Sequence, residues 1–78
     1  MSRFTSVEKS WEERMRTLRQ DLKDEDYGRL YFLLSLCLLD SYDENNYDRH
    51  EATKKTIKAL KKHDYEGIED GLDEMEAL

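Results

Sequence analysis

The feature that most constrains this chain is the segment from Leu30 to Leu39, LYFLLSLCLL, which is apolar at every position except Ser35. Charged residues make up 41% of the whole chain, so no other segment approaches this apolar density. The segment is too short to span a bilayer, because a spanning helix needs about 20 apolar residues. We therefore expect it to be the central element of a hydrophobic core.

The chain has 78 residues, of which 37% are hydrophobic. This length is typical of one domain near the lower limit for independent folding, so we expect residues 1–78 to form a single helical domain. Its core should be thin, and oligomerisation or a partner would add stability. Proline is absent, glycines number only three, and residues that favour strands are few and scattered. These features predict a small all-α bundle of three to four helices with a central apolar second helix.

The first helix is predicted to begin at a capping box, Thr5-Ser6-Val7-Glu8, and to run to about Lys23. In a capping box, the hydroxyl of Thr5 and the carboxylate of Glu8 satisfy each other's free backbone N–H groups. Apolar residues recur every three or four positions along this segment, which is the pattern of a helix with one buried face. They are Phe4, Val7, Trp11, Met15, Leu18 and Leu22.

The second helix is predicted from about Asp26 to Tyr42, after three acids that suit a helix N-terminus. One face of it should pack on the core through Tyr27, Leu30, Tyr31, Leu34, Cys37, Leu38 and Tyr42. Apolar residues also cover much of the remaining surface, so the helix needs burial on several sides. A domain of this size has few elements to provide that burial, which makes self-association a second expectation. The predicted self-association residues are Tyr31, Phe32, Leu36 and Leu39.

Two further helices are predicted after an Asp- and Asn-rich loop over residues 40–48. Asp48 should cap a third helix running from about Arg49 to His63, and Asp64 should cap a fourth. Residues 49–63 hold six basic side chains against one acidic, whereas residues 64–78 hold seven acidic and no basic ones. We expect these two helices to fold against each other and partly neutralise. Gly67 and Gly71 either admit a close neighbouring backbone or are simply tolerated in a short terminal helix.

No arrangement of residues predicts catalysis, a cofactor or a metal site. His50 and His63 are 13 residues apart, about 20 Å along a helix, so they cannot share a metal ion. The single cysteine, Cys37, can form neither an internal disulfide nor a thiolate zinc site. Residues 40–51 have the length of an EF-hand loop, but Tyr42 and Asn45 stand where a ligand and a glycine are required. We therefore expect a protein that is not an enzyme, in a reducing, cytoplasmic setting, without a signal peptide or membrane span.

The net charge of −6 argues against non-specific binding to nucleic acid, which depends on Lys and Arg contacts to phosphates. It suits a protein partner with a basic surface. The sequence therefore predicts a small acidic protein-binding module, an inhibitor or regulator that docks on a basic, nucleic-acid-handling protein. Acids at intervals of three and four residues would form a row of carboxylates that imitates a nucleic acid. The predicted partner-binding residues are Asp43, Glu44, Asp48, Glu66, Glu69, Asp70, Asp73 and Glu74.

Two alternatives remain open at the level of sequence. One is a structural or assembly protein, or a homodimer, that associates through the apolar face of the second helix. The other is a weak DNA-binding regulator whose contacts come from lysines of the third helix. Those lysines are Lys54, Lys58, Lys61 and Lys62. The nearby acids would repel phosphate, so nucleic acid is not the expected partner.

Overall fold

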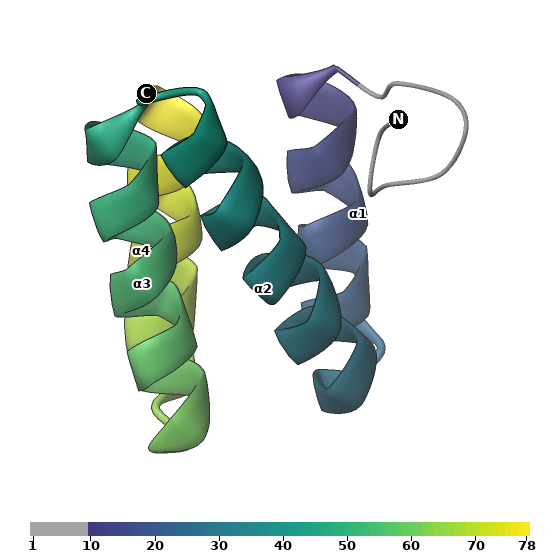
Figure 1. Ribbon diagram of the computed structural model, residues 1–78. Coiled ribbons are helices and arrows are strands. Elements are labelled where there is room, and N and C mark those ends of the chain that lie inside the picture. The colour runs from purple at the N-terminus through teal and green to yellow at the C-terminus, as the bar shows by residue number, and fades with distance from the viewer. Residues whose placement is uncertain (1–9) are drawn as a thin grey trace.

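The computed structural model describes residues 10–78, which form four helices and no strand (Figure 1). The helices are α1 (Trp11–Lys23), α2 (Tyr27–Asp43), α3 (Tyr47–Lys61) and α4 (Tyr65–Ala77). The prediction of a small all-α bundle is confirmed. Within residues 10–78, none of the helices combines the length and apolar character that a membrane crossing requires.

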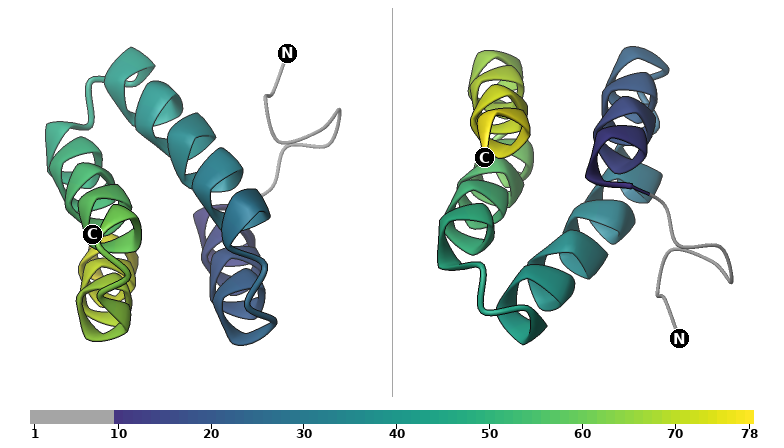
Figure 2. Two further views of the ribbon diagram at one scale, coloured as in Figure 1. Left: turned by 90° about the horizontal axis from the view of Figure 1, so that it is seen from below. Right: turned by 90° about the horizontal axis from the view of Figure 1, so that it is seen from above.

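Each helix packs against two neighbours, so the four form a ring in the order α1, α2, α3, α4 and back to α1. The two end-on views show α3 and α4 together on one side of the bundle and α1 and α2 together on the other (Figure 2). The basic helix α3 lies along the acidic helix α4, as their opposite charges predict. In this arrangement α2 and α4 occupy diagonal positions, and each keeps one face toward solvent.

The core is built from large side chains of α1, α2 and α4 against small side chains of α3. Its apolar members from the first two helices are Met15, Leu18, Leu30, Leu33, Leu34 and Cys37. Helix α4 adds Ile68, Leu72 and Met75, and α3 adds Ala52, Ala59 and Leu60. Thr53 and Thr56 of α3 are also buried, and their hydroxyls donate to the carbonyls of Arg49 and Ala52 one turn back. The small residues of α3 let its neighbours come close.

Of the two glycines in α4, Gly71 lies where the backbone of α3 comes closer. A Cβ at this position would fall on the hydroxyl of Thr56 and lie 3.0 Å from the Thr56 Cα atom. A side chain at Gly67 would instead meet the carboxylate of Asp64 and the Cβ of Ala59. The close-approach interpretation of these two glycines therefore holds for Gly71, where the neighbouring backbone itself is in the way.

The three joints between helices share one backbone design. The middle residue of each has a positive φ, which is 59° at Glu25, 58° at Asn45 and 56° at His63. The residue that follows donates its backbone N–H to a carbonyl five positions back, and its side chain then caps the next helix. This is a Schellman ending joined directly to an N-cap. The capping residues are Asp26, Asn46 and Asp64.

The joint between α2 and α3 is shorter than the sequence suggested. Helix α2 continues through Asp43, and α3 already begins at Tyr47. Asn46 caps α3 by accepting a hydrogen bond from the N–H of Arg49 at 3.3 Å. The prediction that Asp48 caps this helix is therefore wrong, because Asn46 satisfies the free N–H groups two residues earlier and leaves Asp48 in the first turn.

Helix α1 is capped by Ser10, whose side chain accepts from the N–H of Glu13 at 3.2 Å. The predicted capping box over residues 5–8, and the apolar residues Phe4 and Val7, lie outside the described part of the chain. The start of α1 is also tied to the end of α4, because the indole N–H of Trp11 donates to the carbonyl of Met75 at 2.9 Å. This bond closes the ring of helices.

Candidate functional site

The outward face of α4 carries six acidic side chains and no basic one. We call this surface the acidic ridge: Glu66, Glu69, Asp70, Asp73, Glu74 and Glu76. All six are exposed, while Ile68, Gly71, Leu72 and Met75 face the core. Neighbours three or four positions apart on a helix have Cβ atoms about 5–6 Å from each other. The ridge is therefore a row of closely spaced carboxylates.

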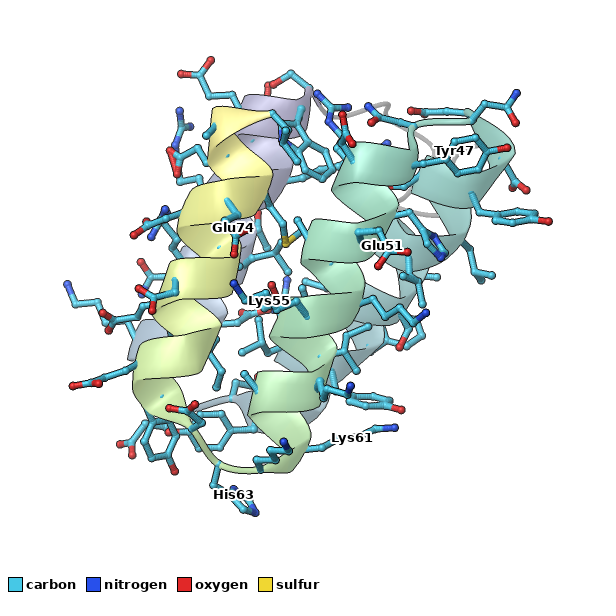
Figure 3. The ribbon with its side chains drawn as sticks, turned by 90° about the vertical axis from the view of Figure 1, so that its left-hand side faces the viewer. Tyr47, Glu51, Lys55, Lys61, His63 and Glu74 are labelled. Carbon is cyan, nitrogen blue, oxygen red and sulfur yellow. The ribbon has the colours of Figure 1, made fainter. Side chains whose placement is uncertain are left out.

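Two cations from other helices pair with the C-terminal half of the ridge. Arg19 of α1 contacts Asp73 at 2.7 Å and Glu76 at 2.8 Å. Lys55 of α3 pairs with Glu74, and the two side chains point toward each other between α3 and α4 (Figure 3). Because Lys55 hydrogen-bonds to Glu74, the pKa of its ammonium is raised above the ordinary value and it stays protonated. These exposed pairs each add at most about 1 kcal/mol.

The N-terminal half of the ridge is less neutralised by the described residues than the C-terminal half. Glu66, Glu69 and Asp70 have no ion-pair partner within residues 10–78.

The acids in the last turns of α4 lie near a helix C-terminus, where negative charge opposes the helix dipole. Their position therefore lowers the stability of α4 instead of raising it.

The remaining predicted partner-binding residues do not join the ridge into one continuous surface. Asp43 and Glu44 lie at the end of α2, and Asp48 lies in the first turn of α3; all three are exposed. Asp48 shares a hollow with a ridge residue, Glu74, in an open depression of about 380 Å³. The structure thus separates the eight residues into a ridge on α4 and a second acidic group at the α2–α3 joint.

No pattern in the sequence indicates the pairing of Arg19 with Asp73 and Glu76. This residue is more than fifty positions from both of its partners, and nothing in local spacing marks it. Arg19 also borders a second open hollow of about 490 Å³, together with Lys23, Tyr27, Tyr65 and Glu69. The rings of Tyr27 and Tyr65 are 5.7 Å apart there, which holds the N-terminal ends of α2 and α4 together.

The outward face of α2 remains apolar and exposed. Phe32 is 60% exposed, Leu39 52% and Tyr42 62%, and Tyr31 is exposed as well. The fourth predicted self-association residue, Leu36, is half-buried against the core. Tyr31 and Tyr42 were predicted to pack on the core, and this is wrong. The buried stripe passes instead through Leu33 and Ser41, together with Leu30, Leu34 and Cys37.

The lysines of α3 form a basic strip beside the acidic ridge. Lys54, Lys58, Lys61 and Lys62 are exposed, and the ammonium of Lys61 stands 5.8 Å from the ring centroid of Tyr31. An open hollow on α3 is lined by three lysines together with Glu51, so an acid lies within the strip itself. The fifth lysine of the helix, Lys55, is occupied by Glu74.

The histidines and the cysteine are not arranged for chemistry. His50 Nδ1 lies 3.2 Å from the carbonyl of Leu38, and His63 occupies the α3–α4 joint at the other end of α3. Cys37 is fully buried, and this burial raises the pKa of its thiol to about 12. Among residues 10–78, no group of three or more His, Cys, Asp or Glu side chains is placed to hold a metal ion.

Comparisons with known proteins provide no relative. No family model, no curated protein and no solved structure matches the chain. What the protein does must therefore be inferred from its own surfaces, and the acidic ridge and the apolar face of α2 are the two that stand out.

Proposed function

We propose that this protein is a non-enzymatic binding module that regulates or inhibits a partner protein by docking the acidic ridge of α4 on a basic surface. The observation that carries the proposal is the one-sided charge of α4, whose outward face holds six acids and no base. A protein that handles nucleic acid is the best-matched partner, because its binding groove is built from Lys and Arg side chains that receive phosphates.

A general need for solubility does not account for the ridge. Soluble surfaces usually intersperse both signs of charge, whereas α4 concentrates one sign on one face. This concentration has a cost, since like charges at intervals of three and four residues repel each other. Arg19 and Lys55 offset part of the repulsion at Asp73, Glu74 and Glu76. Within residues 10–78, Glu66, Glu69 and Asp70 have no ion-pair partner, so they are the strongest candidates for partner contact.

The physical action would be competitive. A row of carboxylates in a basic groove replaces the phosphates that the groove otherwise binds, and the released counterions favour the complex at low salt. Complementary charge also speeds association and excludes partners of the wrong sign. Asp43, Glu44 and Asp48 form a separate acidic group. This group would contact the partner only if the partner's surface extends past the N-terminal end of α3.

The test uses a variant in which the unpaired half of the ridge is neutralised: Glu66→Gln, Glu69→Gln and Asp70→Asn. A partner is first captured on the immobilised wild-type protein from lysate of the native host at low salt, identified and purified. We expect the variant to bind that partner about tenfold or more weakly, because several complementary charges are lost together. Nucleic acid bound by the partner should compete with the wild-type protein.

The matched control carries the same change in net charge elsewhere, as Glu12→Gln, Glu13→Gln and Glu25→Gln, all exposed positions outside the ridge. It should bind the partner as the wild type does. Equal losses of affinity in both variants would mean that net charge alone explains the effect. An unchanged affinity in the ridge variant would show that the ridge is not the docking surface.

A further inference from the structure

The outward face of α2 differs in kind from the outward faces of the other three helices. Helices α1, α3 and α4 present charged side chains to solvent, whereas α2 presents Phe32, Leu39 and Tyr42, all more than half exposed. Large apolar side chains that lie together on one exposed face mark an interaction site more often than scattered ones do. The question is which surface covers this face.

Phe32, Leu39 and Tyr42, together with the small residues Gly28 and Ser35, have the spacing of a coiled-coil seam. Gly28, Phe32, Ser35, Leu39 and Tyr42 follow one another at intervals of four, three, four and three residues. This repeat places all five on one line along a helix, which is the line along which two helices pack side by side. We call these five residues the apolar seam. At 17 residues, α2 is about 25 Å long, enough for the seam to run most of its length.

The seam is complementary to itself when reversed. Arg29, Leu36 and Asp43 follow its flank at seven-residue intervals, with the cation at one end and the acid at the other. Two copies of α2 packed in opposite directions, with their two-fold axis at Leu36, therefore bring Arg29 of each copy beside Asp43 of the other. In a parallel pair the same groups would be about 21 Å apart along the helices and would form no such contact.

The sizes of the seam residues agree with the reversed pairing. Reversal about Ser35, one residue from Leu36, places the ring of Tyr42 level with Gly28 of the second copy and Phe32 within one residue of Leu39. Gly28 has no explanation inside its own chain, because a Cβ added there would meet nothing within 4 Å. Gly28 is the second residue of α2, where glycine costs less than the roughly 1 kcal/mol of a helix interior, but alanine would still fit and favour the helix. Space for an approaching tyrosine supplies the missing reason.

From this self-complementarity we infer that the outward face of α2 is a homodimer interface, in which a second copy of this chain packs its own α2 antiparallel along the apolar seam. The inference is independent of the proposed function. Because α2 and α4 are diagonal in the ring, the dimer would carry its two acidic ridges on its outer sides. A dimer of this kind can engage two basic sites at once.

The first test is sedimentation equilibrium over a concentration series for the wild type, Leu39→Glu and Leu78→Glu. Leu39 and Leu78 are 52% and 51% exposed, so the same substitution is made at equal exposure on and off the seam. We expect a wild-type dimer, a dissociation constant raised at least about tenfold by Leu39→Glu, and no change with Leu78→Glu. A concentration-independent wild-type monomer, or a dimer that survives Leu39→Glu, would overturn the inference.

The second test addresses direction. Arg29→Glu and Asp43→Lys should each weaken the dimer alone, because each sets like charges against each other at both ends. Mixed in equal amounts, the two variants should recover dimerisation, since every flanking pair is again of opposite sign. Failure of the mixture to recover, with both variants shown to be folded by circular dichroism, would overturn the antiparallel arrangement.

Arg29 also contacts the buried carboxylate of Asp21 at 3.5 Å, so Arg29→Glu could disturb folding. A measurement that avoids this position uses a spin label on Glu44→Cys, an exposed joint residue, because the native Cys37 is buried and unreactive. An antiparallel pair with its axis at Leu36 separates the two labels by about 24 Å or more along the helices. Labels at the same level, as in a parallel pair, would contradict the inference.

Discussion

At the scale of single residues, glycines of the same chain have opposite structural roles. A Cβ on Gly28 meets nothing within 4 Å, whereas one on Gly71 would collide with Thr56 of α3. Gly28→Ala should therefore raise the unfolding free energy of the monomer by about 0.5–1 kcal/mol, through helix propensity alone. Gly71→Ala should lower it by about 1–3 kcal/mol, because α3 and α4 must move apart.

Urea denaturation at low protein concentration measures both changes, with dimerisation kept out of the comparison. The two substitutions add the same methyl group to the same residue type, so each serves as the control for the other. Changes of equal sign would contradict the packing at Gly71 or the open surroundings of Gly28.

Cys37 makes stability depend on pH in the alkaline range. Burial raises the pKa of its thiol from 9.0 to about 12, so the folded state disfavours the thiolate. The stabilisation is complete below about pH 9 and is lost as pH rises toward 12, because only the unfolded chain ionises in that interval. The unfolding free energy should fall by up to about 1.4 kcal/mol per pH unit from this group.

The comparison is between wild type and Cys37→Ala, unfolded in urea at a series of pH values between about 8 and 10.5. Tyrosines and lysines titrate in both proteins, so the difference between the two slopes isolates the thiol. Parallel curves would mean that Cys37 is already accessible to water in the folded state.

At the scale of elements, the joints explain how a chain with no proline and no joint glycine turns three corners. Each joint uses a residue other than glycine in the left-handed region, and the residue after it caps the next helix. A tyrosine then begins each helix, at Tyr27, Tyr47 and Tyr65. The pattern of an Asp or Asn followed by Tyr is therefore the repeated signal of a corner in this chain.

Glycine at these positions should stabilise the protein. Left-handed backbone costs an ordinary L residue roughly 1–2 kcal/mol, and glycine adopts it without that cost. After subtracting glycine's greater freedom in the unfolded chain, we expect Glu25→Gly and His63→Gly to raise the unfolding free energy by about 0.5–1 kcal/mol. Asn45→Gly should gain less, because asparagine tolerates this conformation. Thermal unfolding ranks the three variants by stability. A loss of stability in all three would contradict the joint geometry.

The sequence was sufficient for the all-α class, the order of the helices and the approximate limits of α2, α3 and α4, because apolar spacing and capping residues are local signals. It placed Asp64 as a cap correctly and named the group of acids that contains the cap Asp26. It failed at Asp48, since Asn46 offers an equivalent cap two residues earlier. It also placed Tyr42 on the core side of α2. On a helix apolar nearly all round, only the positions of the neighbouring helices decide which side is buried.

The candidate site was only partly accessible to the same reasoning. The ridge follows from spacing within one helix, so its residues could be named from sequence. The pairing of Arg19 with Asp73 and Glu76 depends on α1 lying beside α4, and no local pattern contains that information. The separation of Asp43 and Glu44 from the ridge is likewise a property of the assembled bundle.

At the scale of the whole molecule, charge and apolar surface are segregated. The acidic ridge of α4 adjoins the basic strip of α3, and the apolar seam lies on the diagonal helix α2. Under the two proposals, one side docks a charged partner and the other a second copy of the chain. Binding through the ridge should therefore weaken with salt, whereas association along the seam should persist, because apolar burial is not screened by ions.

The most direct test of the central claim is the salt dependence of partner binding. Affinity for the purified partner is measured across a salt series for the wild type, the ridge variant at Glu66, Glu69 and Asp70, and the charge-matched control. The ridge account predicts a steep loss of wild-type and control affinity with salt and a clearly shallower slope for the ridge variant. Identical slopes for all three proteins would contradict the claim that the acidic ridge is the docking surface.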